Sequence, residues 1–523
     1  MNHPHGLPPS AATTSCDVLV VGGGINGAGI ARDLAGRGLS VLLAEKDDLA
    51  SHTSSSSTKL IHGGLRYLEH FDFGLVRKAL AEREVLLRSA PHIMRPLRFV
   101  MPHDPSMRPA WMIRAGLFLY DHLARREILP ASHTADLRTH PAGRPLKPQF
   151  TRGFVYSDGW VDDARLVVLA AVDAAERGAT VVTGCRVTRA ERGAARWRAT
   201  LQHRSGLAQQ VDARALVNAA GPWAAQFLRD HAGRPDTRAL RLVKGSHIVV
   251  RRLFEHDHAY IFQNRDKRII FAIPYEGDFT LIGTTDVEHH GPVGDARIDA
   301  AETQYLCEQA SRYFARPVSP GDVVWSYAGV RPLLDDENAS DAASVTRDYL
   351  LELDNRGPAL LSVWGGKITT FRKLAEEAAD RLCAALGHPA RAWTAGASLP
   401  GGDLSGWIGV PQRPDTDLLR FESAIAAAHP ELPDAVRRRW VRAYGSRIGA
   451  LLGRPLGEEV APTLHEAELR HLHDHEWARS ADDVLWRRTK LGLHFGPAAR
   501  ERVAQWWKEH IEEPSLLKER AWS

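Results

Sequence analysis

Long apolar runs alternate with helix-compatible stretches at the start of this chain. Val18–Val21 is a continuous run of aliphatic residues, which is typical of a strand buried on both faces. Residues 28–37 have helical spacing and end at Gly38, and a second apolar run follows from Leu39 to Ala44. The pattern therefore predicts a strand, helix and strand packed as the first unit of a parallel sheet.

Two later apolar runs have the same character. Residues 215–221 indicate a strand that enters a small-residue turn, and residues 360–366 indicate a strand that ends in glycines. A helix is expected from Ile368 to Leu382. We expect all three strand regions in one α/β domain, a discontinuous Rossmann-like unit made of residues 16–75, 150–235 and 345–400.

The remaining chain has two other hydrophobic patterns. Short alternating strands near residues 240–290 predict an antiparallel sheet, so residues 76–149 and 236–344 are expected to form a substrate or cap domain. From residue 405 to 523 the spacing becomes helical, which predicts a separate helical domain. Residues 1–15 show no periodicity and are expected to be a disordered leader.

Composition narrows the class without identifying it. A chain of 523 residues with 44% hydrophobic and 25% charged residues is typical of a multidomain globular enzyme. A net charge of +4 is too small to indicate nucleic acid as a partner. The four cysteines are scattered, which argues against a disulfide framework or a zinc site and fits a reducing compartment.

No apolar run reaches the about 18 to 20 residues that a membrane-spanning helix needs. Any membrane contact is therefore expected to be peripheral. Residues 111–120 are apolar and aromatic and are followed by His122, Arg125 and Arg126. This segment fits an interfacial amphipathic helix and equally fits a buried helix of the cap.

The residues after the first strand form a dinucleotide-binding motif. Gly22, Gly24 and Gly27 match GxGxxG, where they allow a tight turn, close approach to a pyrophosphate, and tight packing of helix on strand. The helix N-terminus presents free amides to the phosphates. Glu45 ends the second strand, where an acid accepts hydrogen bonds from adenosine ribose hydroxyls.

A run of hydroxyl residues favours FAD over NAD. Residues 51–58 are rich in Ser and Thr and lead into the segment 59–64, which fits a loop that wraps an extended flavin dinucleotide. The positions expected to contact FAD are Gly22, Gly24, Ile25, Asn26, Gly27, Glu45, Thr53, Ser54, Ser57, Lys59, Leu60, His62, Gly63, Gly64, Val187, Ala220, Gly221, Trp223, Gly366, Lys367, Ile368 and Thr369.

Several longer motifs carry a family resemblance along nearly the whole chain. The segments KLIHGGLRYLE, LVNAAGPW, SYAGVRPL, WGGKITTFRKLAE and DDVLWRRTK resemble the aerobic FAD-dependent glycerol-3-phosphate dehydrogenases. The resemblance implies a fold like the D-amino-acid oxidase group, with a flavin domain, an antiparallel-sheet cap and a C-terminal helical domain. It implies oxidation of sn-glycerol 3-phosphate to dihydroxyacetone phosphate by hydride transfer to FAD, with membrane quinone as the electron acceptor. It further implies a cytoplasmic enzyme attached peripherally to the inner face of the cell membrane, and it is compatible with a homodimer.

Cationic residues in these motifs are the candidates for binding the substrate phosphate. They are Arg66, Arg331, Arg347 and Lys367, with Tyr67 and Thr285 as further substrate contacts. Arginine suits a phosphate because its planar fork donates paired hydrogen bonds. Arg331 and Lys367 are also expected in the catalytic centre.

The base that takes the C2 hydroxyl proton is expected to be a histidine. His62 is favoured because it lies between the flavin-wrapping loop and Arg66, and His247 is the alternative.

Three other functions remain open at this point. A glycerol-3-phosphate oxidase would share these motifs and pass electrons to dioxygen. An oxidase of amino or hydroxy acids would use the arginines on a carboxylate, and a non-catalytic flavoprotein would only sense redox state.

Overall fold

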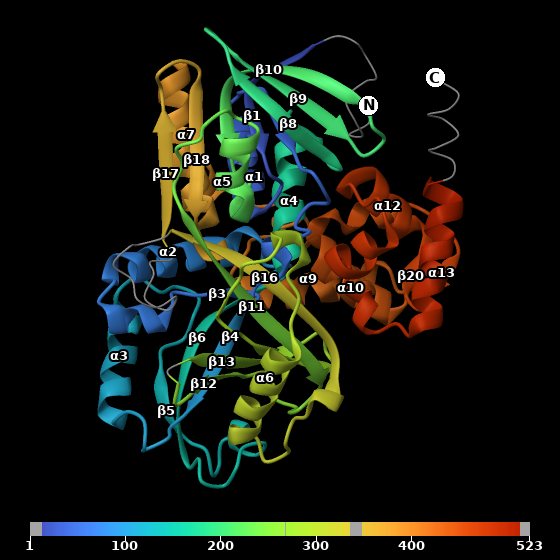
Figure 1. Ribbon diagram of the computed structural model, residues 1–523. Coiled ribbons are helices and arrows are strands. Elements are labelled where there is room, and N and C mark those ends of the chain that lie inside the picture. The colour runs from blue at the N-terminus through green and yellow to red at the C-terminus, as the bar shows by residue number, and fades with distance from the viewer. Residues whose placement is uncertain (1–12, 267, 335–347, 513–523) are drawn as a thin grey trace.

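The computed structural model describes residues 13–266, 268–334 and 348–512 and contains two large sheets with a helical unit beside them (Figure 1). The expected leader falls mostly on residues 1–12, which lie outside the described residues. Its last two positions, Thr14 and Ser15, belong to the first strand, where they pair with Val211 and Asp212.

The first sheet has a parallel centre. Its strands follow the order β17 (Tyr349–Asp354), β18 (Ala359–Gly365), β10 (Ala208–Asn218), β1 (Thr14–Val21), β2 (Val41–Ala44) and β7 (Thr180–Val182). The pairs from β18 to β7 are parallel, and β17 is antiparallel to β18. β8 (Cys185–Arg192) and β9 (Trp197–His203) extend β10 as an antiparallel flap. Segments far apart in sequence thus meet in one sheet, as the three apolar runs predicted.

Both faces of the parallel centre are covered, which explains the apolar runs within β1, β2, β10 and β18. On one face α1 (Ile25–Gly36) lies between α4 (Asp163–Glu176) and α7 (Phe371–Leu386), and their aliphatic side chains share a core with Val18 and Val20. On the other face α5 (Ala224–Asp230) and the flap bury Leu19 and Trp197. Two-sided burial is the arrangement that continuous hydrophobic runs favour.

The second sheet is mainly antiparallel. Its order is β15 (Val287–Glu288), β11 (Leu240–Arg251), β14 (Phe279–Gly283), β13 (Ile269–Tyr275), β12 (Ala259–Gln263), β4 (Met94–Pro102), β6 (Arg152–Val161) and β3 (Leu60–Ile61), with β16 (Val323–Leu334) beside β11 and β5 (His133–Asp136) beside β6. α6 (Ala300–Tyr313) covers one face. α2 (Phe73–Ser89) and α3 (Ala110–His122) pack on the other. The alternating strands predicted near residues 240–290 are β11, β13 and β14.

The expected division of the chain at residue 150 differs from this topology. β6 was expected in the cofactor domain, yet it pairs with β4 along its whole length, from Met94 opposite Val161 to Pro102 opposite Gly153. β3, inside the expected range 16–75, also joins the second sheet through β6. Apolar content shows that a strand is buried but not which sheet it joins, because pairing partners are set by tertiary contacts.

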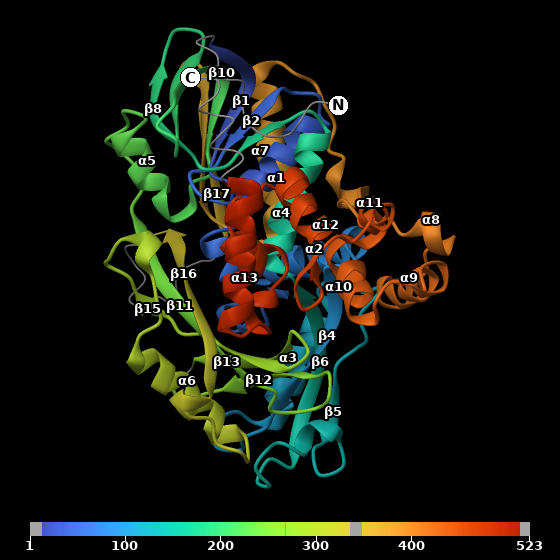
Figure 2. The same ribbon diagram turned by 90° about the vertical axis from the view of Figure 1, so that its right-hand side faces the viewer.

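The C-terminal residues form a helical unit with its own core. α9 (Pro414–Ala428), α10 (Asp434–Tyr444), α12 (Glu466–Glu476) and α13 (Pro497–Trp507) surround buried Phe421, Trp440 and Leu472. The only sheet assigned within its described residues is the short pair β19 (Glu459–Ala461) and β20 (Leu464–His465). Figure 2 shows this unit against the flank where the two large sheets meet, with α12 beside α4.

Among the described residues, no helix is both long enough and apolar enough to cross a lipid bilayer. The four cysteines are buried free thiols.

Candidate cofactor and substrate site

The turn between β1 and α1 has the geometry of a phosphate-binding loop. Gly22 has a φ of +107°, a left-handed conformation that favours glycine. A Cβ on Gly27 would lie 1.8 Å from the Gly22 carbonyl oxygen, so only glycine lets α1 pack this closely on the strand. The loop therefore presents the amides at the start of α1 to an anion.

Glu45 lies at the carboxyl end of β2, beside this loop. Its carboxylate accepts hydrogen bonds from the Gly23 amide at 2.6 Å and from the Asp47 amide at 2.8 Å. Burial raises the pKa of Glu45. These two bonds fix the carboxylate where an acid recognises adenosine ribose in dinucleotide domains.

The hydroxyl-rich segment is fixed by hydrogen bonds to several other elements. The Ile25 amide donates to Ser54 Oγ at 3.0 Å, and Thr53 Oγ1 donates to the Val330 carbonyl at 2.7 Å. Ser57 Oγ donates to Asp163 at 2.7 Å. The segment therefore wraps a wall of the site instead of acting as a flexible linker.

Lys59 has a structural position, not the cofactor contact that was expected. Its side chain is buried, and Nζ lies 2.8 Å from Asp163 Oδ1 at the start of α4. It does not line the cavity described below. Sequence reasoning missed Asp163, which holds both Ser57 and Lys59; its signal was an acidic pair, residues 162 and 163, at the start of a helix.

One cavity of about 800 Å³ joins these elements. It lies within the size range of small-molecule sites, about 300 to 1,000 Å³. The predicted positions that line it are Gly22, Gly24, Ile25, Asn26, Glu45, Thr53, Ser54, Ser57, Leu60, His62, Tyr67, Val187, Ala220, Gly221, Trp223, Arg331, Gly366, Lys367, Ile368 and Thr369. Residues from three distant parts of the chain thus line one cavity.

Two glycines and an asparagine show that the cavity suits a polar ligand lying against the backbone. Asn26 Nδ2 donates to the Gly365 carbonyl at 3.2 Å, while its buried Oδ1 has no hydrogen-bond partner among the described groups. Gly366 has a φ of +103°, and a Cβ there would lie 3.1 Å from Asn26 Nδ2. A ligand that donates a hydrogen bond would satisfy the Asn26 oxygen.

Three predicted glycine contacts do not line the cavity. Gly27 is buried under the phosphate loop. The Gly63 amide donates to the Tyr120 hydroxyl at 2.9 Å, and Gly64 allows close packing of the Tyr67 ring. These glycines shape the backbone around the cavity.

Cationic and polar side chains line the cavity where β16 and the start of α7 approach it. Arg331 forms an ion pair with Asp286, and its Nη2 donates to Thr284 Oγ1 at 2.9 Å. Lys367 Nζ lies 3.7 Å from the centre of the Tyr67 ring, which is a cation–π distance. Arg331, Lys367 and Tyr67 all line this cavity, and Lys367 and Tyr67 are in direct contact.

Thr285 is placed differently from the expectation. It is buried, and its hydroxyl donates to Glu302 Oε1 at 2.7 Å on α6, away from the cavity. The preceding residue, Thr284, lines the cavity instead. Thr284 and Thr285 lie in the connection between β14 and β15, where the backbone directs one side chain to the cavity and the next one to α6.

The two candidate bases have different surroundings. His62 lines the cavity, and its amide donates to Thr369 Oγ1 at 3.2 Å. His247 is fully buried outside the lining, with Nε2 2.9 Å from Thr58 Oγ1 and its ring stacked on Tyr327. Burial, together with nearby Arg331 and Lys59, lowers the pKa of His247 well below its ordinary value.

Two predicted arginines cannot be placed in the site. Arg347 and the side chain of Arg66 lie outside the described residues.

Sequence reasoning also missed Lys46, which lines the cavity with Nζ 4.4 Å from the Trp223 ring centre. Its position next to Glu45 was the available signal. No group of three or more His, Cys, Asp or Glu side chains in the described part of the chain is arranged to hold a metal ion.

Comparison with known proteins adds independent information. Residues 17–372 match the family described as FAD dependent oxidoreductase, and residues 392–512 match the C-terminal domain of alpha-glycerophosphate oxidase. The crystal structure of the glycerol-3-phosphate dehydrogenase from Bacillus halodurans, complexed with FAD, is similar with a TM-score of 0.76 and 27% identity, covering 95% of this chain and 91% of that one.

Curated relatives are similar over nearly the full length. Glycerol-3-phosphate dehydrogenase of Pseudomonas aeruginosa is 51% identical over 96% of both chains. The aerobic glycerol-3-phosphate dehydrogenase of Escherichia coli is 49% identical over 95% of this chain and 98% of its own. D-erythritol 1-phosphate dehydrogenase of Brucella abortus is 48% identical with the same coverage. The chain therefore belongs to the FAD-dependent oxidoreductase family that includes the bacterial glycerol-3-phosphate dehydrogenases, and FAD is its cofactor.

Proposed function

We propose that the protein oxidises sn-glycerol 3-phosphate to dihydroxyacetone phosphate and that its electrons pass to membrane quinone. The observation that carries the proposal is that Arg331 and Lys367 line the same cavity as the phosphate loop. The relatives support it, because those that are 48% to 51% identical are named for phosphate esters of small polyols.

Arg331 and Lys367 are proposed to bind the substrate phosphate. The contacts of Arg331 with Asp286 and Thr284 fix the orientation of its guanidinium before substrate arrives. Lys367 adds a second charge, held over the Tyr67 ring. Such fixed cations favour a phosphate dianion because charge-assisted hydrogen bonds are about twice as strong as neutral ones.

His62 is proposed as the base for the C2 hydroxyl. It lines the cavity, whereas His247 is buried outside it. Bound FAD supplies the acceptor for the C2 hydride. His62 would hold the hydroxyl and take its proton, and Tyr67 would help to orient the phosphate from the same wall.

The helix α3 supports attachment to a lipid surface. Trp111 is 70% exposed and Phe118 is 58% exposed, on the helix face opposite buried Leu117 and Tyr120. Phe71 is also exposed, and Arg125 lies just beyond the end of α3. An exposed apolar face with nearby basic residues is typical of helices that lie in a membrane interface.

Anaerobic mixing with substrate tests the reaction. We expect glycerol 3-phosphate to bleach the flavin absorbance rapidly, and glycerol to have no effect, because only the ester carries the dianion. Faster bleaching by D-erythritol 1-phosphate would reassign the substrate. A flavin that stays oxidised with all three compounds would contradict the proposal.

Reoxidation of the reduced enzyme identifies the electron acceptor. Rapid recovery of flavin absorbance with a soluble quinone, and slow recovery with dioxygen, is the result expected of a dehydrogenase. Stoichiometric peroxide in air would instead make the protein an oxidase.

A further inference from the structure

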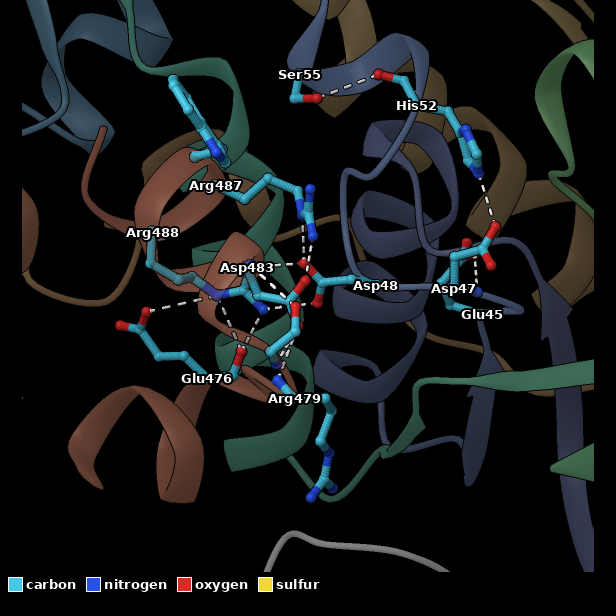
Figure 3. Close-up of polar contacts among 12 residues, drawn as sticks. Glu45, Asp47, Asp48, His52, Ser55, Glu476, Arg479, Asp483, Arg487 and Arg488 are labelled. Atoms are coloured by element: carbon cyan, nitrogen blue, oxygen red, sulfur yellow. Dashed lines mark hydrogen bonds and ion pairs between the residues drawn. The ribbon is translucent and has the colours of Figure 1, made fainter. Parts of the chain in front are cut away.

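Two arginines of the C-terminal unit bind an aspartate of the cofactor domain (Figure 3). Arg488 donates from Nη1 and Nη2 to the two oxygens of Asp48, each at 2.8 Å. Arg487 donates from Nε to Asp48 Oδ2 at 2.6 Å. Asp48 and Arg488 are buried, and the charges of both arginines outweigh burial and lower the pKa of Asp48.

The arginines are themselves fixed within the C-terminal unit. Arg488 donates from Nε and Nη2 to the carbonyl of Glu476, at 3.1 and 2.6 Å, and Arg487 pairs with Asp483. Asp483 also accepts the amide of Arg479 at 2.8 Å. The motif DDVLWRRTK, which has no residue in the cavity, thus forms a rigid anchor on the surface that faces Asp48.

Asp48 lies in the middle of a loop whose two ends line the cavity. Glu45 precedes it at the end of β2, and residues 50–54 follow it along the wall. The Ser51 amide donates to the Asp48 carbonyl at 3.2 Å, which begins the turn back toward the cavity. Asp47 is held by His52 at 2.8 Å and by Arg204 at 3.0 Å. Figure 3 shows Asp47 and Asp48 directed to opposite sides of the loop.

We propose that Arg487 and Arg488 are positioning residues for FAD, which act through Asp48 on the loop from Glu45 to Ser54. By holding this loop in its binding conformation, the C-terminal unit slows the release of FAD. Coupling of this kind is reciprocal, so bound FAD also strengthens the attachment of the C-terminal unit.

The attachment of the C-terminal unit has other contacts that do not involve the loop. Arg165 on α4 pairs with buried Glu476, and the Trp486 ring stacks on Trp325 of β16 with centres 4.8 Å apart. Loss of Asp48 therefore releases the loop while these contacts keep the unit attached. A purely structural ion pair would change stability alone, whereas a positioning role changes the release of FAD.

The test compares FAD release from full-length holoenzymes. Dissociation after dilution is followed by the rise in flavin fluorescence for the wild type, Asp48→Asn, Arg488→Gln and the double variant. We expect both single variants to release FAD about tenfold faster, a usual size for coupling between sites. The double variant should release it no faster than the worse single variant, because the two side chains form one contact.

Arg439→Gln is the matched control. Arg439 donates from Nη2 to buried Glu468 at 2.6 Å, so its loss removes a buried ion pair inside the C-terminal unit without contact to Asp48. We expect a lowered melting temperature and an unchanged rate of FAD release. An unchanged rate in Asp48→Asn and Arg488→Gln, or an equal increase in Arg439→Gln, would overturn the proposal.

Two further measurements keep the test decisive. Arg487→Gln leaves the Arg488–Asp48 pair intact, so it should fold and release FAD moderately faster even if Asp48→Asn fails to accumulate. Hydrogen exchange of residues 483–493 should quicken when FAD is removed from the wild type. Unchanged exchange, with unchanged release from Arg487→Gln, would again argue against positioning.

Discussion

At the scale of single residues, the structure separates candidates that sequence could not separate. His62 was a candidate between the flavin-wrapping loop and Arg66, and His247 was one in an alternating strand, yet only His62 lines the cavity. Arg331 and Lys367 line that cavity, while Lys59, equally cationic, is buried on Asp163 outside the lining. The direction in which each side chain points therefore decides which charge is available to a substrate.

The first prediction concerns the proposed base. His62→Asn is expected to lower the rate of flavin reduction by about 10² to 10⁴, the usual contribution of a positioned base, with FAD still bound. Stopped-flow absorbance measures this rate. His247→Asn should lower stability far more than it lowers the reduction rate. An unaffected rate in His62→Asn would remove His62 as the base.

Arg331→Lys tests the phosphate contact at the same scale. Lysine keeps the charge but loses the planar fork that holds Asp286 and Thr284. We expect kcat/KM for glycerol 3-phosphate to fall by about 10- to 100-fold, mainly through KM, which corresponds to the loss of a binding contact. Arg186→Lys, at a cation that lines the cavity next to Val187, is the control. Equal effects at both positions would argue against a specific role for Arg331.

At the scale of elements, two helices with apolar sequences differ in how much of their surface is buried. α1 buries nearly all its residues between the sheet and neighbouring helices. α3 instead buries Leu117 and Tyr120 and leaves Trp111 and Phe118 exposed. Sequence had left this segment open between a buried and an interfacial helix. In the described residues α3 packs one face on the second sheet and leaves the other exposed, which is the arrangement that the proposed interfacial role requires.

The prediction at this scale is a loss of lipid binding. The double variant Trp111→Ser and Phe118→Ser should sediment with anionic vesicles at least about tenfold less than the wild type, because each buried aromatic contributes about 1.5 to 3 kcal/mol. Flavin reduction by substrate should be unchanged. Leu207→Ser, at an exposed apolar residue in the flap, is the matched control. Equal vesicle binding by the double variant would exclude α3 as the lipid contact.

At the scale of the whole molecule, buried histidines make the fold sensitive to acid. Burial lowers the pKa of His92 to about 3, and that of His471 to about 4. Between pH 6.5 and these pKa values, both side chains stay neutral in the folded protein, whereas the same side chains take up protons in the unfolded chain. Stability is therefore full above about pH 6.5 and falls as the pH drops toward these values.

We expect the free energy of unfolding to fall by up to about 1.4 kcal/mol per pH unit for each such histidine below pH 6.5. Urea unfolding at pH 7.5 and pH 5 measures the change. Burial raises the pKa of Glu276 to about 6, so this residue adds stability as the pH falls and partly offsets the effect of the histidines. Comparing the wild type with His92→Gln isolates the contribution of His92. A wild-type pH dependence in His92→Gln would contradict the role of His92.

Sequence by itself determined the features that depend on backbone conformation and burial within short segments. The glycine loop, Glu45 and the two-sided apolar strands are fixed by backbone conformation and burial over short stretches, so the fold class and the cofactor followed from their order. The family motifs added the reaction.

Only the tertiary structure decided what depends on contacts between distant segments. It placed β6 in the second sheet, turned Thr285 toward Glu302, buried Lys59 on Asp163, and brought Arg488 to Asp48 across 440 positions of the chain. Pairing and side-chain direction arise from long-range packing, which no local pattern specifies. Most residues of the cavity could be named in advance because they belong to local motifs. The role of the C-terminal motif could not, because it depends on a contact with a distant segment.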